Sequence, residues 1–359
     1  KPGSPLNNPG AIRFWAGSPV ARESIAVDGI QLPDALLPVP KRFESMNAGL
    51  KSFALQGTLE KPFPYAYDPI EGLYTQLWCW ADRTARDAKK IYELCCGILV
   101  GLGFGLVLLT QLSPVHKGAL WLALLIAYWA FPVLQNGPKQ RFISRRCLAE
   151  CLTVQYLWIA LGVSDDAADL FHTRSNTKDL GWIRNVLRGA RIQLLIYHTQ
   201  HERARSNALA KAQAWINGPN GQIQFLRQRI RSFTILAKRW DYTAIFLGSM
   251  SVACAFLEDY RAVPAQTDKV VIVLLAALFA ALAYSRLIGY AETADRYRRS
   301  LAMFERGSLA MALATKEEHE AKALDERQRI VIEALGREKL DELNDWVAGQ
   351  LQRVYAPGA

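Results

Sequence analysis

Four side chains of the kind that bind zinc occur as two pairs with helical spacing, Cys147 with Cys151 and His198 with His201. Structural zinc sites usually take their cysteines from tight knuckle loops, and no such loop pattern surrounds these pairs. Helical spacing instead places the two members of each pair on one face of a helix. We therefore expect no metal site, and no sequence motif indicates a cofactor.

A second chemical candidate is a group of three carboxylates, Asp165, Asp166 and Asp169. Such a group could bind a metal through hard oxygen ligands. We favour the alternative that it lies at the start of a helix, where carboxylates interact with the positive end of the helix dipole. The chain has no Gly-x-x-x-x-Gly-Lys-Ser/Thr loop, no Gly-x-Ser-x-Gly elbow and no His-Glu-x-x-His motif. We therefore expect a protein that is not an enzyme.

Small residues recur where they could line a pore or a helix interface. Gly97, Gly101 and Gly105 are spaced four apart inside one uncharged stretch, and Ser249 and Ser251 lie inside another. The string from 101 to 105 is similar to a dinucleotide-binding loop, but that fingerprint requires a preceding strand and a following acidic residue. Inside a membrane helix the same glycines let a second helix approach closely, and we favour this interpretation over a flexible pore lining.

Four uncharged stretches would position these residues: 94–112, 118–135, 242–257 and 270–284. At a rise of about 1.5 Å per residue, each of the first two can cross the roughly 30 Å hydrocarbon core of a bilayer, and neither carries a polar stripe at helical period. The last two are shorter, so a buried hairpin of a soluble domain is an alternative for them. We predict an all-α, polytopic membrane protein with two transmembrane helical hairpins, four spans in total, and cytoplasmic helices.

Basic residues flank both hairpins on one side. The positive-inside rule therefore places both hairpin tips outside and both termini in the cytoplasm, with the chain as a multi-pass protein of a bacterial inner membrane. This distribution accounts for most of the net charge of +10, so we expect the lipid bilayer as a partner and no nucleic acid. The juxtamembrane basic candidates are Arg145, Arg146, Lys238, Arg239, Arg298 and Arg299.

Three acidic residues stand at the ends of spans: Glu93, Glu258 and Asp259. In an oligomer they could form rings that attract cations. The alternative, which we favour, is that they are ordinary acids of the membrane interface. No charged residue lies deep within a span unless Arg286 is counted, which disfavours a coupled transporter.

The predicted regions follow the hairpins. They are 1–76, a Pro-rich N-terminal arm or linker; 77–136, the first hairpin with its leading helix; 137–241, a cytoplasmic helical region; 242–290, the second hairpin; and 291–359, cytoplasmic C-terminal helices. We expect helices at 41–54, 141–161, 180–201 and 206–215, and one at 292–324 that directly continues the last span. Gly336 is expected to separate helices at 325–333 and 338–354. The chain begins with Lys1 rather than Met, so we consider a further domain before it.

Two stretches carry a family resemblance. The first runs through Asp165, Asp169 and the string Asp179-Leu180-Gly181-Trp182-Ile183-Arg184-Asn185-Val186-Leu187-Arg188-Gly189. The second comprises the last hairpin with Ala291-Glu292, Asp295-Arg296-Tyr297, Leu335-Gly336-Arg337-Glu338 and Asn344-Asp345-Trp346-Val347. Together, over residues 75 to 359, the chain resembles the membrane region of bacterial proteins in which a SLOG domain, similar to the sensor of melastatin-type (TRPM) channels, precedes membrane helices. Its last part is similar to SLATT domains.

The resemblance implies a function. SLATT domains are two-span modules proposed to act as pore-forming effectors in bacterial immunity, and the SLOG domain is a nucleotide sensor. This chain has no SLOG fingerprint, so the resemblance places the sensor for a nucleotide ligand before Lys1 or on a partner. We therefore expect a homo-oligomeric ion channel or pore-forming effector gated by a nucleotide-type signal. The alternative is a non-conducting membrane scaffold that anchors a cytoplasmic sensor or partner.

Overall fold

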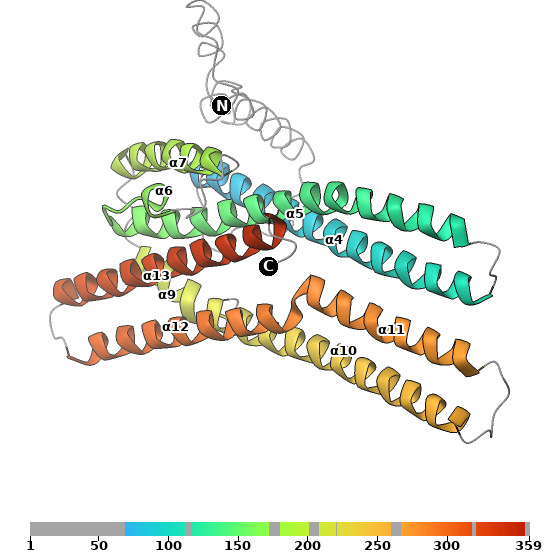
Figure 1. Ribbon diagram of the computed structural model, residues 1–359. Helices are drawn as coiled ribbons and strands as arrows, with labels where there is room; N and C mark the ends of the chain where they lie inside the picture. The colour runs from blue at the N-terminus through green and yellow to red at the C-terminus, as the bar shows by residue number, and fades with distance from the viewer. Residues whose placement is uncertain are drawn as a thin grey trace, which may run out of the picture. The chain divides into compact units, whose positions relative to one another are not determined.

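The computed structural model describes residues 69–112, 117–171, 180–200, 208–219, 221–259, 267–317 and 321–355. All regular structure in these ranges is α-helical (Figure 1), which confirms the all-α part of the predicted fold class for the described chain. The helices are α4 (Pro69–Leu112), α5 (Lys117–Leu161), α6 (Ala167–Leu170), α7 (Gly181–Gln200), α9 (Ala208–Asn217), α10 (Gln222–Asp259), α11 (Thr267–Ile288), α12 (Tyr290–Glu317) and α13 (Ala321–Tyr355).

Among the described residues, three helical runs are by length and composition apolar enough to cross a membrane: Tyr74–Gln111, Ala208–Leu257 and Asp268–Ala314. They contain three of the four predicted spans. The fourth predicted span, 118–135, lies within α5, but its side chains fall almost entirely outside the described part of the structure. The structure therefore describes a membrane protein with three candidate spans, and the fourth stays a prediction.

The chain divides into two compact units, each built from segments that are distant in sequence. We call Asp87–Gln140 with Ile223–Ala302 the membrane unit, because it contains the uncharged stretches. We call Lys1–Arg86, Arg141–Gln222 and Met303–Ala359 the helical unit. The predicted short helix at 41–54 and most of the Pro-rich arm lie outside the described residues.

The core of the helical unit forms around the second half of α5. Leu148, Leu152 and Trp158 of this helix are fully buried. The N-terminal part of α4 packs here through two hydrogen bonds: the Tyr74 hydroxyl donates to the Leu152 carbonyl at 2.7 Å, and Trp78 Nε1 donates to Thr153 Oγ1 at 2.9 Å. Both aromatic side chains of α4 are therefore bound to α5 within the helical unit.

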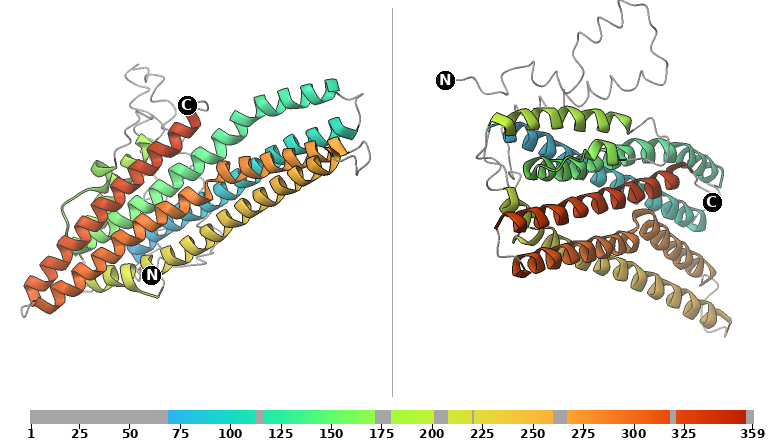
Figure 2. Two further views of the ribbon diagram at one scale, coloured as in Figure 1. Left: turned by 60° about the horizontal axis from the view of Figure 1, so that its bottom comes forward. Right: turned by 90° about the vertical axis from the view of Figure 1, so that its left-hand side faces the viewer.

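In the membrane unit, α10 and α11 lie side by side as an antiparallel pair (Figure 2). Small side chains are buried in this pair: Ala244 and Ser251 of α10 and Ala281 of α11. A Cβ at Gly248 would lie 3.7 Å from Leu278 of α11. Small residues allow such close packing of membrane helices. Large apolar side chains point away from the protein, including Leu94, Ile98, Leu102, Leu109, Ile245, Phe246, Val252, Phe256 and Phe279.

Two sequence predictions about helix continuity are wrong. The last span does not continue directly into the cytoplasmic helix, because α11 ends at Ile288, Gly289 has φ +69°, and α12 begins at Tyr290. The left-handed backbone at Gly289 ends one helix, as glycine does at many helix C-termini. The chain changes direction at this point (Figure 1).

The second wrong prediction concerns Gly336, which does not break a helix: α13 runs without interruption from Ala321 to Tyr355. Gly336 instead permits close packing. A Cβ at Gly336 would lie 2.6 Å from Trp158 Cε2, and one at Gly307 of α12 would lie 2.7 Å from Leu335 Cδ2. These glycines let α13 pack closely against α5 and α12.

Candidate functional site

Hydrogen bonds on both sides of Gly289 define the break between α11 and α12 in the membrane unit. The N–H of Gly289 donates to the Ser285 carbonyl at 3.0 Å and completes the last turn of α11. The first turn of α12 starts at once, because Thr293 donates to the Gly289 carbonyl through both its N–H at 3.0 Å and its hydroxyl at 2.8 Å. Two helices therefore meet at a single residue with no intervening loop.

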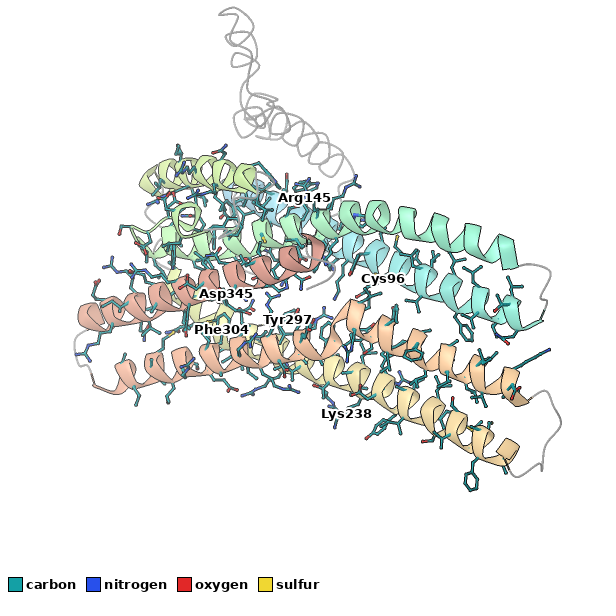
Figure 3. The ribbon with its side chains drawn as sticks, viewed as in Figure 1. Cys96, Arg145, Lys238, Tyr297, Phe304 and Asp345 are labelled. Carbon is teal, nitrogen blue, oxygen red and sulfur yellow. The ribbon has the colours of Figure 1, made fainter. Side chains whose placement is uncertain are left out.

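Aromatic side chains from α10 and α12 pack beside this break. The ring of Phe233 lies 6.2 Å from that of Tyr290 and 5.7 Å from that of Tyr297, measured between centroids. Both separations fall in the favourable range for ring pairs. Figure 3 shows Tyr297 on α12, within the same unit as the break. Phe233 is buried, so these contacts fix the start of α12 against α10.

Helix α4 contacts the residues around this break through two side chains, Tyr92 and Lys89. The Tyr92 hydroxyl donates to the Leu287 carbonyl at 3.3 Å, which satisfies an acceptor that the end of α11 leaves without an intrahelical partner. The Lys89 ammonium lies 4.9 Å from the centre of the Phe233 ring and 3.6 Å from Glu93. We call Gly289, Tyr92, Phe233, Tyr290 and Tyr297, with Lys89 and Glu93, the Gly289 junction.

The predicted small-residue candidates occupy different environments. A Cβ at Gly97 would lie 3.7 Å from Tyr284 Cε2 of α11, whereas at Gly101 and Gly105 no atom of the described chain lies within 4 Å. Ser251 of α10 is buried, and Ser249 is exposed. The packing seam predicted on α4 stays a prediction, because most side chains of the neighbouring span in α5 are not described.

The predicted basic residues divide into two groups. Arg145 is held in the helical unit, with its guanidinium 4.0 Å from the Trp80 ring centre and 5.0 Å from that of Trp182 (Figure 3). Arg146 pairs with Asp82 at 3.0 Å and also with Glu150. Lys238, Arg239, Arg298 and Arg299 belong to the membrane unit and are exposed.

The predicted span-end acids are only partly described. Glu93 belongs to the Gly289 junction through its ion pair with Lys89. Glu258 and Asp259 lie in the last turn of α10, and their side chains fall outside the described part of the chain. Whether these acids form rings around a cation path stays a prediction.

The three predicted carboxylates lie in the helical unit at the turn between α5 and α7. Asp166 caps α6 by accepting from the Ala168 N–H at 2.8 Å, which confirms a helix-start position for it. Asp169 pairs with Arg188 of α7 at 2.9 Å, and Asp165 accepts from Arg337 Nε of α13 at 2.6 Å. Each carboxylate is therefore engaged by protein.

Arginines of α7 also bind the backbone of this turn. Arg184 Nε donates to the Ala168 carbonyl at 3.0 Å, and Arg191 Nη2 donates to the Ser164 carbonyl at 2.6 Å. From the opposite side, Asn344 Nδ2 of α13 donates to the Leu170 carbonyl at 3.0 Å. Arg191 also pairs with Asp166 at 3.1 Å. We call these contacts, with the pairs Asp169–Arg188, Asp165–Arg337 and Asp166–Arg191, the loop clamp. It joins residues from both stretches that carry the family resemblance.

The pKa of two groups in this unit follows from their surroundings. The Arg188 guanidinium lowers the pKa of the Asp169 carboxyl through a hydrogen bond, which keeps this carboxylate charged. Burial raises the pKa of the Cys151 thiol, and the nearby Cys147 and Glu150 act in the same direction. A protonated, buried thiol is a poor metal ligand. Among the described side chains, no three His, Cys, Asp or Glu residues are grouped to hold a metal; His198 and His201 are not among them.

No family model, no curated protein and no solved structure matches this chain. The resemblance to SLOG-associated and SLATT proteins therefore rests on the quoted sequence motifs alone. The described structure adds that the two stretches carrying those motifs contact each other through Asp165 with Arg337 and Leu170 with Asn344.

Sequence reasoning missed the Gly289 junction. Gly289 follows an apolar stretch and precedes a charged helix, and this position at a change of composition was the available signal. The aromatic partners gave no signal, because Tyr92 and Phe233 are more than a hundred residues apart and only the tertiary fold brings them together.

Proposed function

We propose that this chain is the subunit of a homo-oligomeric ion channel or pore-forming effector of a bacterial inner membrane. In this proposal a nucleotide-type signal, sensed before Lys1 or on a partner, reaches the spans through the cytoplasmic helices. The pore is closed by an apolar constriction and conducts after the helices rearrange, as hydrophobic gates do.

The observation that carries the proposal is the Gly289 junction. A scaffold needs only an anchor, and an uninterrupted helix from α11 into α12 would anchor equally well. A joint with a left-handed glycine instead lets the last span and the following helix change their mutual angle. Helix α12 begins in the membrane unit and ends in the helical unit, so one element could carry a displacement to this joint.

The small share of span residues that is buried within a single subunit supports assembly into an oligomer. Only 6% of the residues in the most apolar windows of the α4 and α11 spans are buried. The uncharged stretches within these spans, 94–112 and 270–284, also have no charged side chain that would require water within a single subunit. Lipid covers part of this surface, and further copies of the chain would cover the rest around a central axis.

The test is ion flux through the purified protein reconstituted in liposomes, with and without adenine-nucleotide-derived ligands. We expect flux that depends on protein density more steeply than linearly, because several copies build one pore. A Gly289→Ala variant, inserted to the same density, should change the flux. Absence of flux at every protein density and ligand condition would contradict the proposal and favour the non-conducting scaffold.

A further inference from the structure

The exposed side chains on one side of α10 change from basic to apolar along the helix. At 100° per residue, Arg227, Arg231 and Lys238 lie on one side of this helix, and Tyr242 and Ile245 continue the same side. All five side chains are exposed. Lys238 is on the side of α10 that faces away from α11 (Figure 3). One continuous surface is thus basic in the first half of the helix and apolar in the second.

Position along the helix separates the basic residues by depth. Lys238 precedes Tyr242, the first residue of the uncharged stretch, by four residues, or about 6 Å along the axis. The headgroup layer is about 5–7 Å thick on each side of the hydrocarbon core, so Lys238 and its neighbour Arg239 fall within it. Arg231 and Arg227 lie about 16 and 22 Å from Tyr242 and fall beyond it.

A ring pair within the protein also indicates that the headgroup layer lies near Lys238 and Arg239. The rings of Trp240 and Tyr284 pack with centroids 5.0 Å apart, and such amphipathic rings prefer the membrane interface. The guanidinium of Arg298 is occupied, because it donates to Thr234 Oγ1 at 3.1 Å and pairs with Asp295. In the described chain, neither Lys238 nor Arg239 forms an ion pair, although the exposed Asp241 is nearby in sequence.

We propose that Lys238 and Arg239 bind the headgroup phosphate of an anionic phospholipid of the cytoplasmic leaflet. The lysine contributes a point charge, and the arginine contributes a planar fork of donors that fits phosphate oxygens. The acyl chains lie along the apolar residues that follow, Tyr242 and Ile245 in line with Lys238 and Phe246 in line with Arg239, and each of the three is more than 60% exposed. The site is a lipid site rather than a general basic surface, because the headgroup-binding residues are followed by chain-binding residues along the exposed side of α10.

Two double variants of the full chain test this proposal. Lys238→Gln with Arg239→Gln removes two charges at headgroup depth. Arg227→Gln with Arg231→Gln removes two charges from the same helix and leaves the headgroup level intact, so it is the matched control. Both variants are inserted into nanodiscs of equal parts phosphatidylglycerol and phosphatidylcholine, and the lipids retained after detergent extraction are quantified by native mass spectrometry. Circular dichroism verifies that both variants keep the helical content of the wild type.

We expect the wild type to retain phosphatidylglycerol preferentially. Each basic residue near an anionic surface contributes about a fivefold preference, so the first variant should reduce the enrichment by fivefold or more, and the second by less than about twofold. An equal reduction in both variants would overturn the proposal, because it would show dependence on net charge alone. Unchanged enrichment in the Lys238 and Arg239 variant would overturn it as well.

Discussion

At the scale of single residues, Gly336 has the sharpest steric requirement among the glycines of α13. A Cβ there would collide with the indole of Trp158, which is itself fully buried, so neither group has space to move. Because α13 must pack closely against α5 at this point, a methyl group forces the helices apart. The glycine is therefore a packing residue within a continuous helix.

We predict that Gly336→Ala lowers the free energy of unfolding by about 1–3 kcal/mol, the usual effect of overpacking a core. Gly349 of the same helix is the matched control, because no described atom lies within 4 Å of the position of its Cβ. Gly349→Ala should raise the free energy of unfolding by about 0.5–1 kcal/mol through helix propensity. Thermal unfolding in detergent measures both. Equal effects of the two substitutions would contradict the close approach at Gly336.

The pair of Asp169 and Arg188 predicts a dependence on pH. Because Arg188 lowers the pKa of Asp169 from 3.8, the carboxylate form stabilises the folded state. This contribution is present above the unfolded-state pKa and is lost as the pH falls through the lower folded-state pKa. Arg188→Gln should thus lower the melting temperature at pH 7, and the difference from wild type should shrink towards pH 3. Both residues are exposed, so the effect is small. A difference that is constant from pH 7 to pH 3 would show that the pair does not titrate as described.

At the scale of elements, the change of direction between α11 and α12 depends on the left-handed backbone conformation of Gly289. An L-residue in this conformation costs about 1–2 kcal/mol, so we predict that Gly289→Ala destabilises the protein by that amount or straightens the joint. Asn tolerates left-handed backbone better than Ala. Gly289→Asn should therefore lie between the wild type and Gly289→Ala in thermal stability. If Ala and Asn had the same effect, the backbone conformation would not be the cause.

The hydrogen bond from Tyr92 to the Leu287 carbonyl is a second requirement of the same joint. Tyr92→Phe keeps the ring and removes the donor. We expect a loss of about 1 kcal/mol, the net contribution of a typical hydrogen bond, in thermal unfolding. Tyr242→Phe is the control, because this tyrosine is 67% exposed on α10. A comparable loss from the control would indicate a general effect of removing tyrosine hydroxyls.

At the scale of the whole molecule, the sequence predicted the helices well because apolar periodicity and turn residues are local signals. The helices expected at 180–201 and 206–215 are confirmed by α7 and α9, with ends that differ by at most two residues. Prediction failed where tertiary contact decides the role of a residue. Gly336 was expected to break a helix and instead lies against Trp158 within one. The contacts of Arg145 with Trp80 and Trp182 had no signal in the sequence. Such partners are far apart in sequence, so no local pattern reports them.

The membrane orientation is a prediction for the whole chain. Asp268 begins the α11 span at its predicted outer end, and Gln228 is exposed on the predicted cytoplasmic part of α10. In intact cells a membrane-impermeant maleimide should label Asp268→Cys and spare Gln228→Cys, with the wild type reporting the background of native thiols. Permeabilised cells should show labelling of both. The reverse pattern in intact cells would invert the topology.

The central claim is that copies of this chain form a defined pore, and recordings of single openings in planar bilayers test it most directly. We expect discrete current steps of one amplitude, because a fixed number of subunits surrounds one axis. Gly289→Ala should change the fraction of time spent open and leave the step amplitude unchanged, since the junction lies at the end of the spans. A silent bilayer containing verified protein, or irregular leakage without steps, would contradict the claim.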